Sequence, residues 1–358
     1  MEPQADTPAE RGAEAPCPTG TANKSWRDSA TLCALVAILG TGALGCLLML
    51  LSVNGFRQYG AVVFCLSPGI CGLGAVLLHE WARPTVAPRV GALATAVVGL
   101  LAALTALGLL LAGGAEGLIC VLMALPFAFI MALVGAAIGA MLAGMSDKSR
   151  PLPMLMTVLV LYPAAQQYEA SHPAPIVPRL ITTQLEVAVP PAQVWAALTR
   201  PVQYPAATGW FRAGVVYPAR TAFARDSASG CRTLVCHYSQ GLARLPVVAW
   251  QPGRQLTFAV PPADMPAPMH ELSPYPQIHA PHLHGYFQVD SGTFRLRALP
   301  GGRTLLEART VYRHSIGPQF YWRLWSDYLL DAMHQRVLAT LKAEAETLAT
   351  TQAPARHD

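Results

Sequence analysis

The sequence predicts an N-terminal all-α transmembrane bundle followed by an α+β domain, in which a curved antiparallel sheet surrounds a long C-terminal helix. Two observations carry this prediction. Four long apolar runs, with no charged residue inside them, lie between residues 30 and 145. Near the C-terminus, a pair of strand-like segments is followed by roughly 30 residues with a helical apolar period. The apolar stripe of that helix has to be buried, and a sheet containing the strand pair is the surface available.

The composition excludes several classes of protein. Charged residues make up only 13% of the 358 residues and hydrophobic residues 53%, whereas soluble domains average about 25% charged residues. The net charge of +5 is small and dispersed, so we expect no nucleic-acid partner. No nucleotide-binding loop, nucleophile elbow or zinc-type cysteine pair is present, and we therefore expect no cofactor. The sequence does not indicate an oligomeric state.

The first 145 residues divide into a tail and four spans. Residues 1–29 are rich in Pro, Ala, Glu and Thr, which predicts a disordered tail. Four runs reach or approach the roughly 20 residues that a transmembrane helix needs: Ala30–Leu51, Gly60–Leu78, Val90–Ala112 and Leu118–Met145. Glycines recur in them, as in the GxxxG pair Gly135 and Gly139, which predicts close helix packing. An ion or proton path is not expected, because the runs contain no Asp, Glu, Lys or Arg.

Lys and Arg residues near the ends of the runs predict the orientation of a multi-pass protein of the cell membrane. Most lie in the tail, in the second loop and after the fourth run: Arg11, Lys24, Arg27, Arg83, Arg89, Lys148 and Arg150. The first loop has only Arg57, and the third has none. The tail, the second loop and the region after the fourth run are therefore expected in the cytoplasm.

Residues 146–177 are predicted to form a linker with a short apolar segment, Pro151–Ala165. Its apolar core of about a dozen residues is short for a span and more typical of an interfacial or buried segment. If the segment does not cross the membrane, the C-terminal domain is cytoplasmic, which is the orientation we favour. If it crosses as a fifth span, the domain lies outside.

Residues 178–350 have the composition of an α+β domain. Strands are predicted at Leu180–Val189, Ala213–Tyr217, Arg232–Ser239, Leu245–Trp250 and Gln255–Val260. A short helix enters through proline at Pro190–Leu198, and Val202–Trp210 is a loop or a second short helix. Pro261–Leu283 is predicted to be a long loop rich in Pro and His.

The last three elements of the domain carry the strongest patterns. Strands at Thr293–Leu299 and Thr304–Arg313 flank the turn Pro300–Gly302, in which glycine adopts positive φ at low cost. The helix that follows has an apolar stripe expected to face the sheet: Phe320, Leu324, Tyr328, Met333, Val337, Leu341 and Leu348.

The segment Ile181–Trp195 (ITTQLEVAVPPAQVW) combines a strand, a proline pair and an apolar–Trp pair that opens a helix. With the meander and the long last helix, residues 178–348 resemble the START-like helix-grip superfamily, which includes polyketide cyclase/dehydrase-like and Bet v 1-like domains. Met269–Tyr275, Pro281–Tyr286 and Tyr321–Asp327 make the chain similar to a bacterial membrane-anchored subgroup. The resemblance implies a hydrophobic ligand between sheet and helix, and supports the fold more than any reaction.

We therefore predict a membrane-anchored domain that binds a hydrophobic or amphipathic small molecule, such as a lipid or an isoprenoid-like compound. Membrane lipids and this ligand are its expected partners. The side chains expected to line the cavity are Tyr238, Phe294, Leu296, Ala308, Thr310, Tyr312, Leu324, Tyr328 and Met333.

Two other functions remain open. The domain could be an enzyme of cyclase, dehydratase or hydrolase type, with Glu307 or His282 as acid or base. It could also be a structural or regulatory module whose own side chains fill the cavity. The loop residues His279, His282 and His284 could hold Zn²⁺ or Fe²⁺ together with Glu271, but they lie among prolines, so we expect no metal there.

Overall fold

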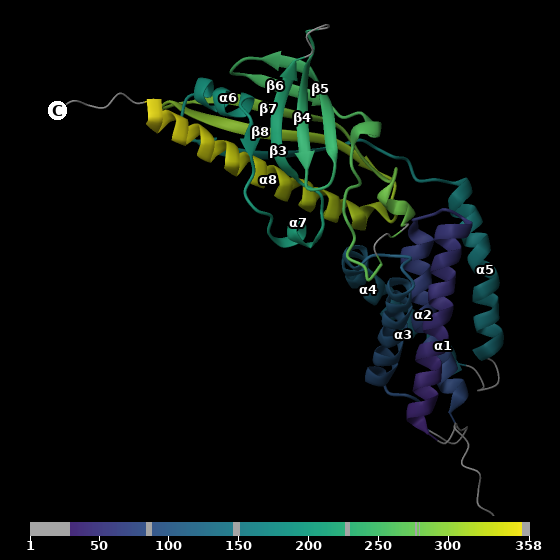
Figure 1. The fold of residues 1–358 in the computed structure, drawn as a ribbon. Coiled ribbons are helices and arrows are strands. Elements are labelled where there is room, and N and C mark those ends of the chain that lie inside the picture. Colours follow the sequence, from purple (N-terminus) through teal and green to yellow (C-terminus); the bar gives the residue numbers. More distant parts are fainter. Residues whose placement is uncertain are drawn as a thin grey trace, which may run out of the picture.

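The structure is a computed structural model that describes residues 29–83, 88–145, 151–225, 230–275, 278 and 280–352. The predicted tail therefore lies outside the described residues except for Ser29, and so do Lys148, Arg150 and His279. A helical bundle and a sheet domain follow one another along the chain (Figure 1).

The bundle contains the four predicted spans. Helix α1 (Ala30–Leu50) continues through the π-helical turn η2 (Leu51–Gly55), and the turn η3 (Val62–Leu66) leads into α2 (Ser67–Ala82). Helices α3 (Ala92–Ala112) and α4 (Leu118–Met145) complete it. Within the described residues, four helices are long and apolar enough to cross a membrane, as predicted.

Helices α2 and α4 pack with their backbones in close approach, which small residues permit. A Cβ atom added at Gly135 would come within 1.9 Å of the carbonyl oxygen of Gly69. A Cβ added at Gly72 would meet the carbonyl oxygen of Ala132 at the same distance. The glycines at these two positions are therefore required by the helix packing.

Much of the segment predicted as a linker is instead a helix, α5 (Pro151–Ser171), that packs along the bundle (Figure 1). Leu159 contacts the apolar cluster of Leu73 and Leu77 in α2. The hydroxyl of the buried Tyr162 lies 2.7 Å from Ser67 Oγ. Near the end of α5, the carboxylate of Glu169 accepts hydrogen bonds from backbone N–H groups at the start of η3. Helix α5 thus runs antiparallel to α4 and returns the chain to the end of the bundle where α4 begins.

The C-terminal domain contains one antiparallel sheet of eight strands in the order β1-β8-β7-β6-β5-β4-β3-β2. The strands are β1 (Arg179–Val187), β2 (Val202–Gln203), β3 (Pro218–Arg225), β4 (Arg232–Tyr238), β5 (Leu242–Gln251), β6 (Gln255–Ala259), β7 (Phe287–Leu299) and β8 (Arg303–His314). Two short helices, α6 (Pro191–Thr199) and α7 (Gly209–Ala213), lie between the first strands. The predicted hairpin turn is present, with φ of 76° at Gly301 and 71° at Gly302.

One predicted strand, Ala213–Tyr217, is wrong. Gly214 has φ of 137°, and the segment pairs with the long loop instead of the sheet. Val216 N–H donates to the carbonyl of Pro268, and His270 N–H donates to the carbonyl of Gly214. The strand β3 begins only after this contact, at Pro218.

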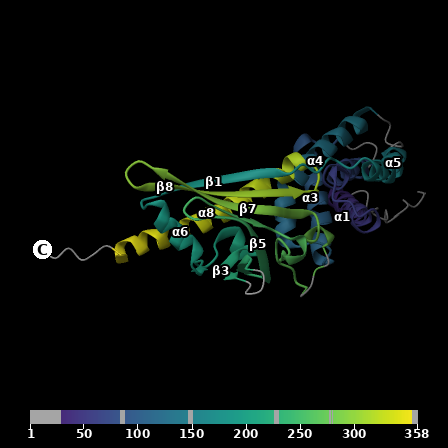
Figure 2. The same ribbon diagram turned by 90° about the horizontal axis from the view of Figure 1, so that it is seen from above.

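Helix α8 (Gln319–Gln352) lies against the sheet, and its first residues meet the bundle (Figure 2). The predicted fold class is confirmed: an apolar helical region precedes a curved antiparallel sheet that grips a C-terminal helix. The first half of the predicted stripe on α8 is wrong, because Phe320, Leu324 and Tyr328 are 61%, 61% and 53% exposed. Trp322 is buried in their place, since this end of α8 packs against α4.

Candidate functional site

A cavity of about 690 Å³ lies between the sheet, α8 and the end of the bundle. Its walls are mostly apolar. The domain contributes residues of the sheet and of α8, among them Phe223, Leu234, Leu256, Phe258, Leu330 and Val337. The bundle contributes residues near the ends of its helices, among them Met49, Val53, Phe64, Leu107, Leu110 and Met123. The cavity is therefore shared between the domain and the membrane helices.

The nine side chains predicted to line the cavity divide into two groups. Tyr238, Phe294, Ala308, Thr310 and Met333 line it. The other four lie elsewhere. Leu296 packs in the apolar core beside α8, while Leu324 and Tyr328 are exposed on the other face of that helix.

Tyr312, the fourth residue outside the lining, is completely buried and its hydroxyl donates to Asp327 of α8. Asp327 also pairs with Arg179 of β1 at 3.1 Å. The hydrogen bond of this tyrosine therefore connects the first part of α8 to strand β8 of the sheet.

The long loop attaches the domain to the first turn of α4. The carboxylate of Glu271 accepts hydrogen bonds from the N–H groups of Ile119 at 3.0 Å and Cys120 at 3.2 Å. The carbonyl of Leu272 accepts a third, from Leu118 N–H at 2.9 Å. A carboxylate at a helix N-terminus satisfies free N–H groups and complements the helix dipole. The loop thus caps a membrane helix.

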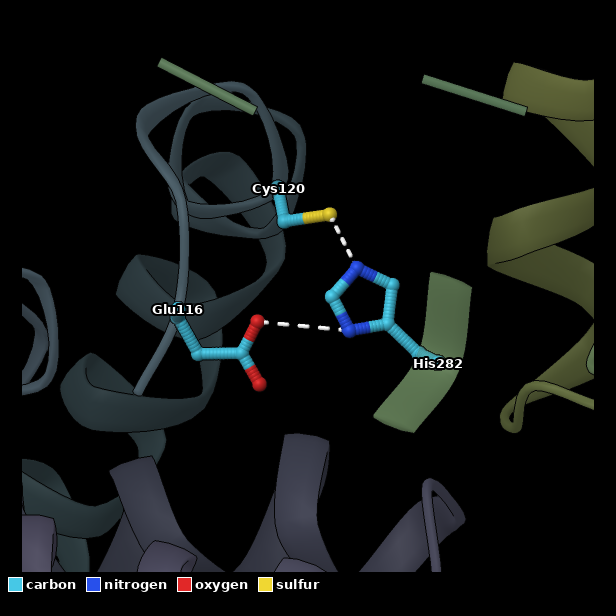
Figure 3. Close-up of side chains that lie close together, drawn as sticks. All are labelled: Glu116, Cys120 and His282. Carbon is cyan, nitrogen blue, oxygen red and sulfur yellow. Dashed lines mark hydrogen bonds and ion pairs between the residues drawn. The ribbon is translucent and has the colours of Figure 1, made fainter. Parts of the chain in front are cut away.

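Beside this cap, His282 lies against two side chains of the bundle (Figure 3). Its Nε2 is 2.7 Å from Cys120 Sγ, and its Nδ1 is 3.4 Å from Glu116 Oε2. Glu271 Oε1 lies 3.9 Å from Nε2. The Tyr59 hydroxyl donates to Glu116 Oε1 at 2.8 Å. Tyr59, Glu116, Cys120 and His282 all line the cavity, so this cluster is the polar part of its wall.

Burial and charge act in opposite directions on this cluster. Burial raises the pKa of Glu116 above its ordinary value, although His282 and the Tyr59 hydroxyl lower it. For His282, burial lowers the pKa, but Glu116 and Glu271 outweigh it and raise the pKa above its ordinary value. The cluster therefore favours the positively charged form of His282. It disfavours the negative charge of Glu116 unless a nearby cation compensates that charge.

The predicted acid or base Glu307 is buried within the sheet but does not line the cavity. Its carboxylate accepts a hydrogen bond from Gln184 at 2.7 Å and pairs with Arg309. Burial raises the pKa of Glu307, but these two partners lower it below its ordinary value. A general base at neutral pH needs a raised pKa, which is the opposite shift. Because Glu307 also lies outside the cavity lining, its contacts are structural and it does not reach a ligand in the cavity.

Among the described residues, the structure groups His282 with Glu116 and Cys120 rather than with His284. His284 lines the cavity from an exposed position, and His279 lies outside the described residues. Glu116 and Cys120, which meet His282, were missed because they precede it by more than 160 residues in the sequence. One signal was available: Glu116 is the only charged residue between the third and fourth apolar runs, and it lies four residues before Cys120.

A second polar group in the cavity wall, His334 of α8, was also missed. Its Nδ1 lies 2.9 Å from the hydroxyl of Thr183, and its Nε2 lies 2.7 Å from that of Thr310. Because the Thr183 hydroxyl donates to Asp331, we assign the proton of His334 to Nδ1. Burial lowers the pKa of His334 to about 4, although Asp331 raises it.

No family model matches the chain, and no curated protein matches it. Similar solved structures include the di-domain aromatase/cyclase StfQ from the steffimycin biosynthetic pathway (16% identity, TM-score 0.31). The Zhui aromatase/cyclase from a Streptomyces species (15%, 0.26) and truncated norcoclaurine synthase from Thalictrum flavum (10%, 0.29) are others.

The matches cover 56%, 50% and 49% of this chain, and 60%, 99% and 96% of the three solved chains. The chain thus spans less than two thirds of StfQ. Likeness at these identities and TM-scores concerns the backbone alone and says nothing of what this chain binds or catalyses.

Proposed function

We propose that this protein binds a hydrophobic or amphipathic small molecule, such as a lipid or an isoprenoid-like compound, and exchanges it with the membrane. The observation that carries the proposal is the shared wall of the cavity. Its volume of about 690 Å³ is within the range of small-molecule sites, about 300–1,000 Å³. Bundle residues such as Val53 and Leu107 form part of the wall, so an apolar ligand that entered between the membrane helices would avoid water.

Polar groups at two places in the wall support an amphipathic ligand over a purely apolar one. The cluster around His282 lies where the domain meets the bundle, and His334 with Thr310 lies between the sheet and α8. A few polar groups in an apolar site orient a ligand and give it specificity.

Native mass spectrometry of the full chain, purified in detergent from its host membranes, tests this proposal. We expect one tightly held apolar or amphipathic adduct per chain, which stays bound when loosely associated lipids are removed. A folded chain that carries no adduct beyond those loosely associated lipids would contradict the proposal.

We also propose that the domain lies on the extracytoplasmic side of the cell membrane. The sequence-based expectation of a cytoplasmic domain assumed that residues 151–165 do not cross. Within the described residues, helix α5 is not one of the four helices whose length and composition suit a membrane span. It nevertheless runs along α2 from the Leu77 level to Ala61, and this packing supports a return across the membrane against the bundle. The domain then lies opposite the loop that contains Arg83 and Arg89, which the positive-inside rule assigns to the cytoplasm.

Labelling of introduced cysteines by an impermeant thiol reagent in intact cells checks the orientation. In a background without native cysteines, Thr351→Cys, at an exposed position near the end of α8, should be labelled readily. Gly91→Cys, placed in open space before α3, is the matched control and should be labelled only after the cells are opened. The reverse pattern would return the domain to the cytoplasm.

A further inference from the structure

We propose that Glu116, Cys120 and His282 bind a divalent transition-metal ion, with Zn²⁺ as the best match, in the cavity wall between the domain and the bundle. One ligand atom of each residue lies within 4.8 Å of those of the other two. A thiolate, an imidazole and a carboxylate are the three side-chain donors that Zn²⁺ takes. Sulfur and nitrogen donors disfavour Mg²⁺ and Ca²⁺, which prefer oxygen.

The spacing of His282 and Glu116 fits two ligands of one ion. Nδ1 of His282 is buried and forms no hydrogen bond, yet it points at Glu116 Oε2 from 3.4 Å. With bonds of about 2.0–2.2 Å, two ligand atoms of a tetrahedral Zn²⁺ lie roughly 3.3–3.5 Å apart. Sγ of Cys120 faces the other ring nitrogen, Nε2, at 2.7 Å, so closing the site requires the ring to turn until one nitrogen faces both partners.

The charges around the site also call for a cation. Glu116 and Glu271 are both buried or nearly so, and in the described part of the chain their ion pairs are with His282 alone. A thiolate at Cys120 would add a third negative charge. One protonated imidazole carries a single positive charge and cannot compensate these negative charges, whereas a divalent ion bound between the ligands adds two positive charges.

Neighbouring groups hold the three ligands in place. The Tyr59 hydroxyl donates to Glu116, and the Tyr59 ring packs edge-on against the His282 ring with centroids 5.1 Å apart. Glu271 fixes the first turn of α4, which carries Cys120. Such outer contacts orient metal ligands. These ligands therefore come from supported positions, whereas His284 of the same loop is exposed.

Three protein ligands leave a fourth position of a tetrahedral ion open, which is typical of zinc sites that act on a bound molecule. All three ligands line the cavity, so that position faces its contents. Water or a polar group of an amphipathic ligand would fill it. Metal binding is measured with the ion alone, and its outcome is therefore separate from that of the proposed ligand binding.

A rival interpretation is a line of hydrogen bonds from Cys120 through His282 to Glu116, as in enzymes with a cysteine nucleophile. In the structure the two ring nitrogens do face different partners (Figure 3). The charges favour the metal. A free thiolate at Cys120 would be repelled by the carboxylates of Glu271 and Glu116, whereas a bound divalent ion would compensate these negative charges. The experiment below separates the two.

The full chain in detergent is stripped with a chelator and titrated with Co²⁺, whose bond to a thiolate gives an ultraviolet absorption band; Zn²⁺ is then added as competitor. We expect one Co²⁺ per chain, with the band abolished in Cys120→Ser and binding lost in His282→Ala. Tyr59→Phe should weaken binding by about 10–100-fold, as for other outer contacts. His237→Ala, in β4 and outside the cavity lining, and Cys46→Ser, in α1, are controls that should bind as the wild type does.

Thermal unfolding of each variant shows whether it is folded, and Glu116→Gln provides a variant of unchanged shape that removes only the charge. A folded wild-type chain that binds neither Co²⁺ nor Zn²⁺ would overturn the proposal, as would a band that persists in Cys120→Ser. Absence of metal binding together with rapid alkylation of Cys120, lost in His282→Ala, would assign the cluster to nucleophilic chemistry instead.

Discussion

Replacing Ala308 by Trp is expected to empty the cavity of its ligand. Ala308 is 3% exposed on β8, lines the cavity and lies opposite Phe294 of β7. An indole at this position projects into the space that the ligand would occupy. We expect the affinity for the ligand to fall at least about tenfold, which corresponds to about 1.4 kcal/mol of binding free energy, and the co-purified adduct to decrease with it. Binding of a dansyl-labelled fatty acid, followed by fluorescence, should fall in parallel.

The control for this change is Ala298→Trp. Ala298 is an exposed residue near the end of β7, outside the lining of the cavity. The same enlargement there should leave adduct and probe binding unchanged. Overpacking can itself cost about 1–3 kcal/mol of folding free energy, so the thermal unfolding of both variants is measured first. A folded Ala308→Trp chain with normal occupancy would show that the ligand binds elsewhere.

Local patterns predicted the elements that depend on local chemistry. Leu118–Met145 was predicted with its observed bounds, because an uninterrupted apolar run defines a membrane helix by itself. The hairpin of β7 and β8 was predicted from alternation and two glycines. Both signals lie within the segment that they describe, so no knowledge of distant partners was needed.

Elements that depend on a distant partner were misplaced. The residues 213–217 alternate like a strand, but Val215 pairs with Met269 of the long loop. The start of α8 has two possible apolar faces, and the bundle selects the one with Trp322. Helix α5 contains Gln166 and Glu169, which read as linker residues, but Gln166 is buried and Glu169 caps η3. In each case the partner lies far away in the sequence.

The site residues also divide into those that local patterns predict and those that depend on a distant partner. The alternation of β7 and β8 placed Phe294, Ala308 and Thr310 in the cavity wall, where they lie, but it also placed Leu296 and Tyr312 there, and these two do not line the cavity. No pattern links Cys120 to His282, because one belongs to a membrane helix and the other to a loop of the domain. Their meeting depends on how the domain docks on the bundle, through Glu271 and the first turn of α4. A group of side chains contributed by two parts of a chain can be identified only when the position of one part relative to the other is known.

Lowering the pH from about 6.5 to about 4 is expected to weaken the folded state through His334. The pKa of this side chain falls from 6.5 to about 4 on folding, because it is buried between Thr183 and Thr310, and Asp331 offsets this only in part. Within that window the unfolded chain binds a proton that the folded chain does not, so the free energy of unfolding falls as the pH falls. At about 1.4 kcal/mol per pH unit, the loss reaches up to about 3 kcal/mol.

Thermal unfolding of the full chain between pH 4 and 7.5 measures the effect of His334. A glutamine at this position has a donor and an acceptor for the two threonines but does not titrate, so His334→Gln should show a flatter dependence across the window. Near pH 7.5 the imidazole is almost entirely neutral in both states, and there the difference between the two proteins should barely change with pH. His172→Gln, at an exposed histidine just after α5, should follow the wild type. If wild type and His334→Gln lose stability in parallel as the pH falls, groups other than His334 cause the loss.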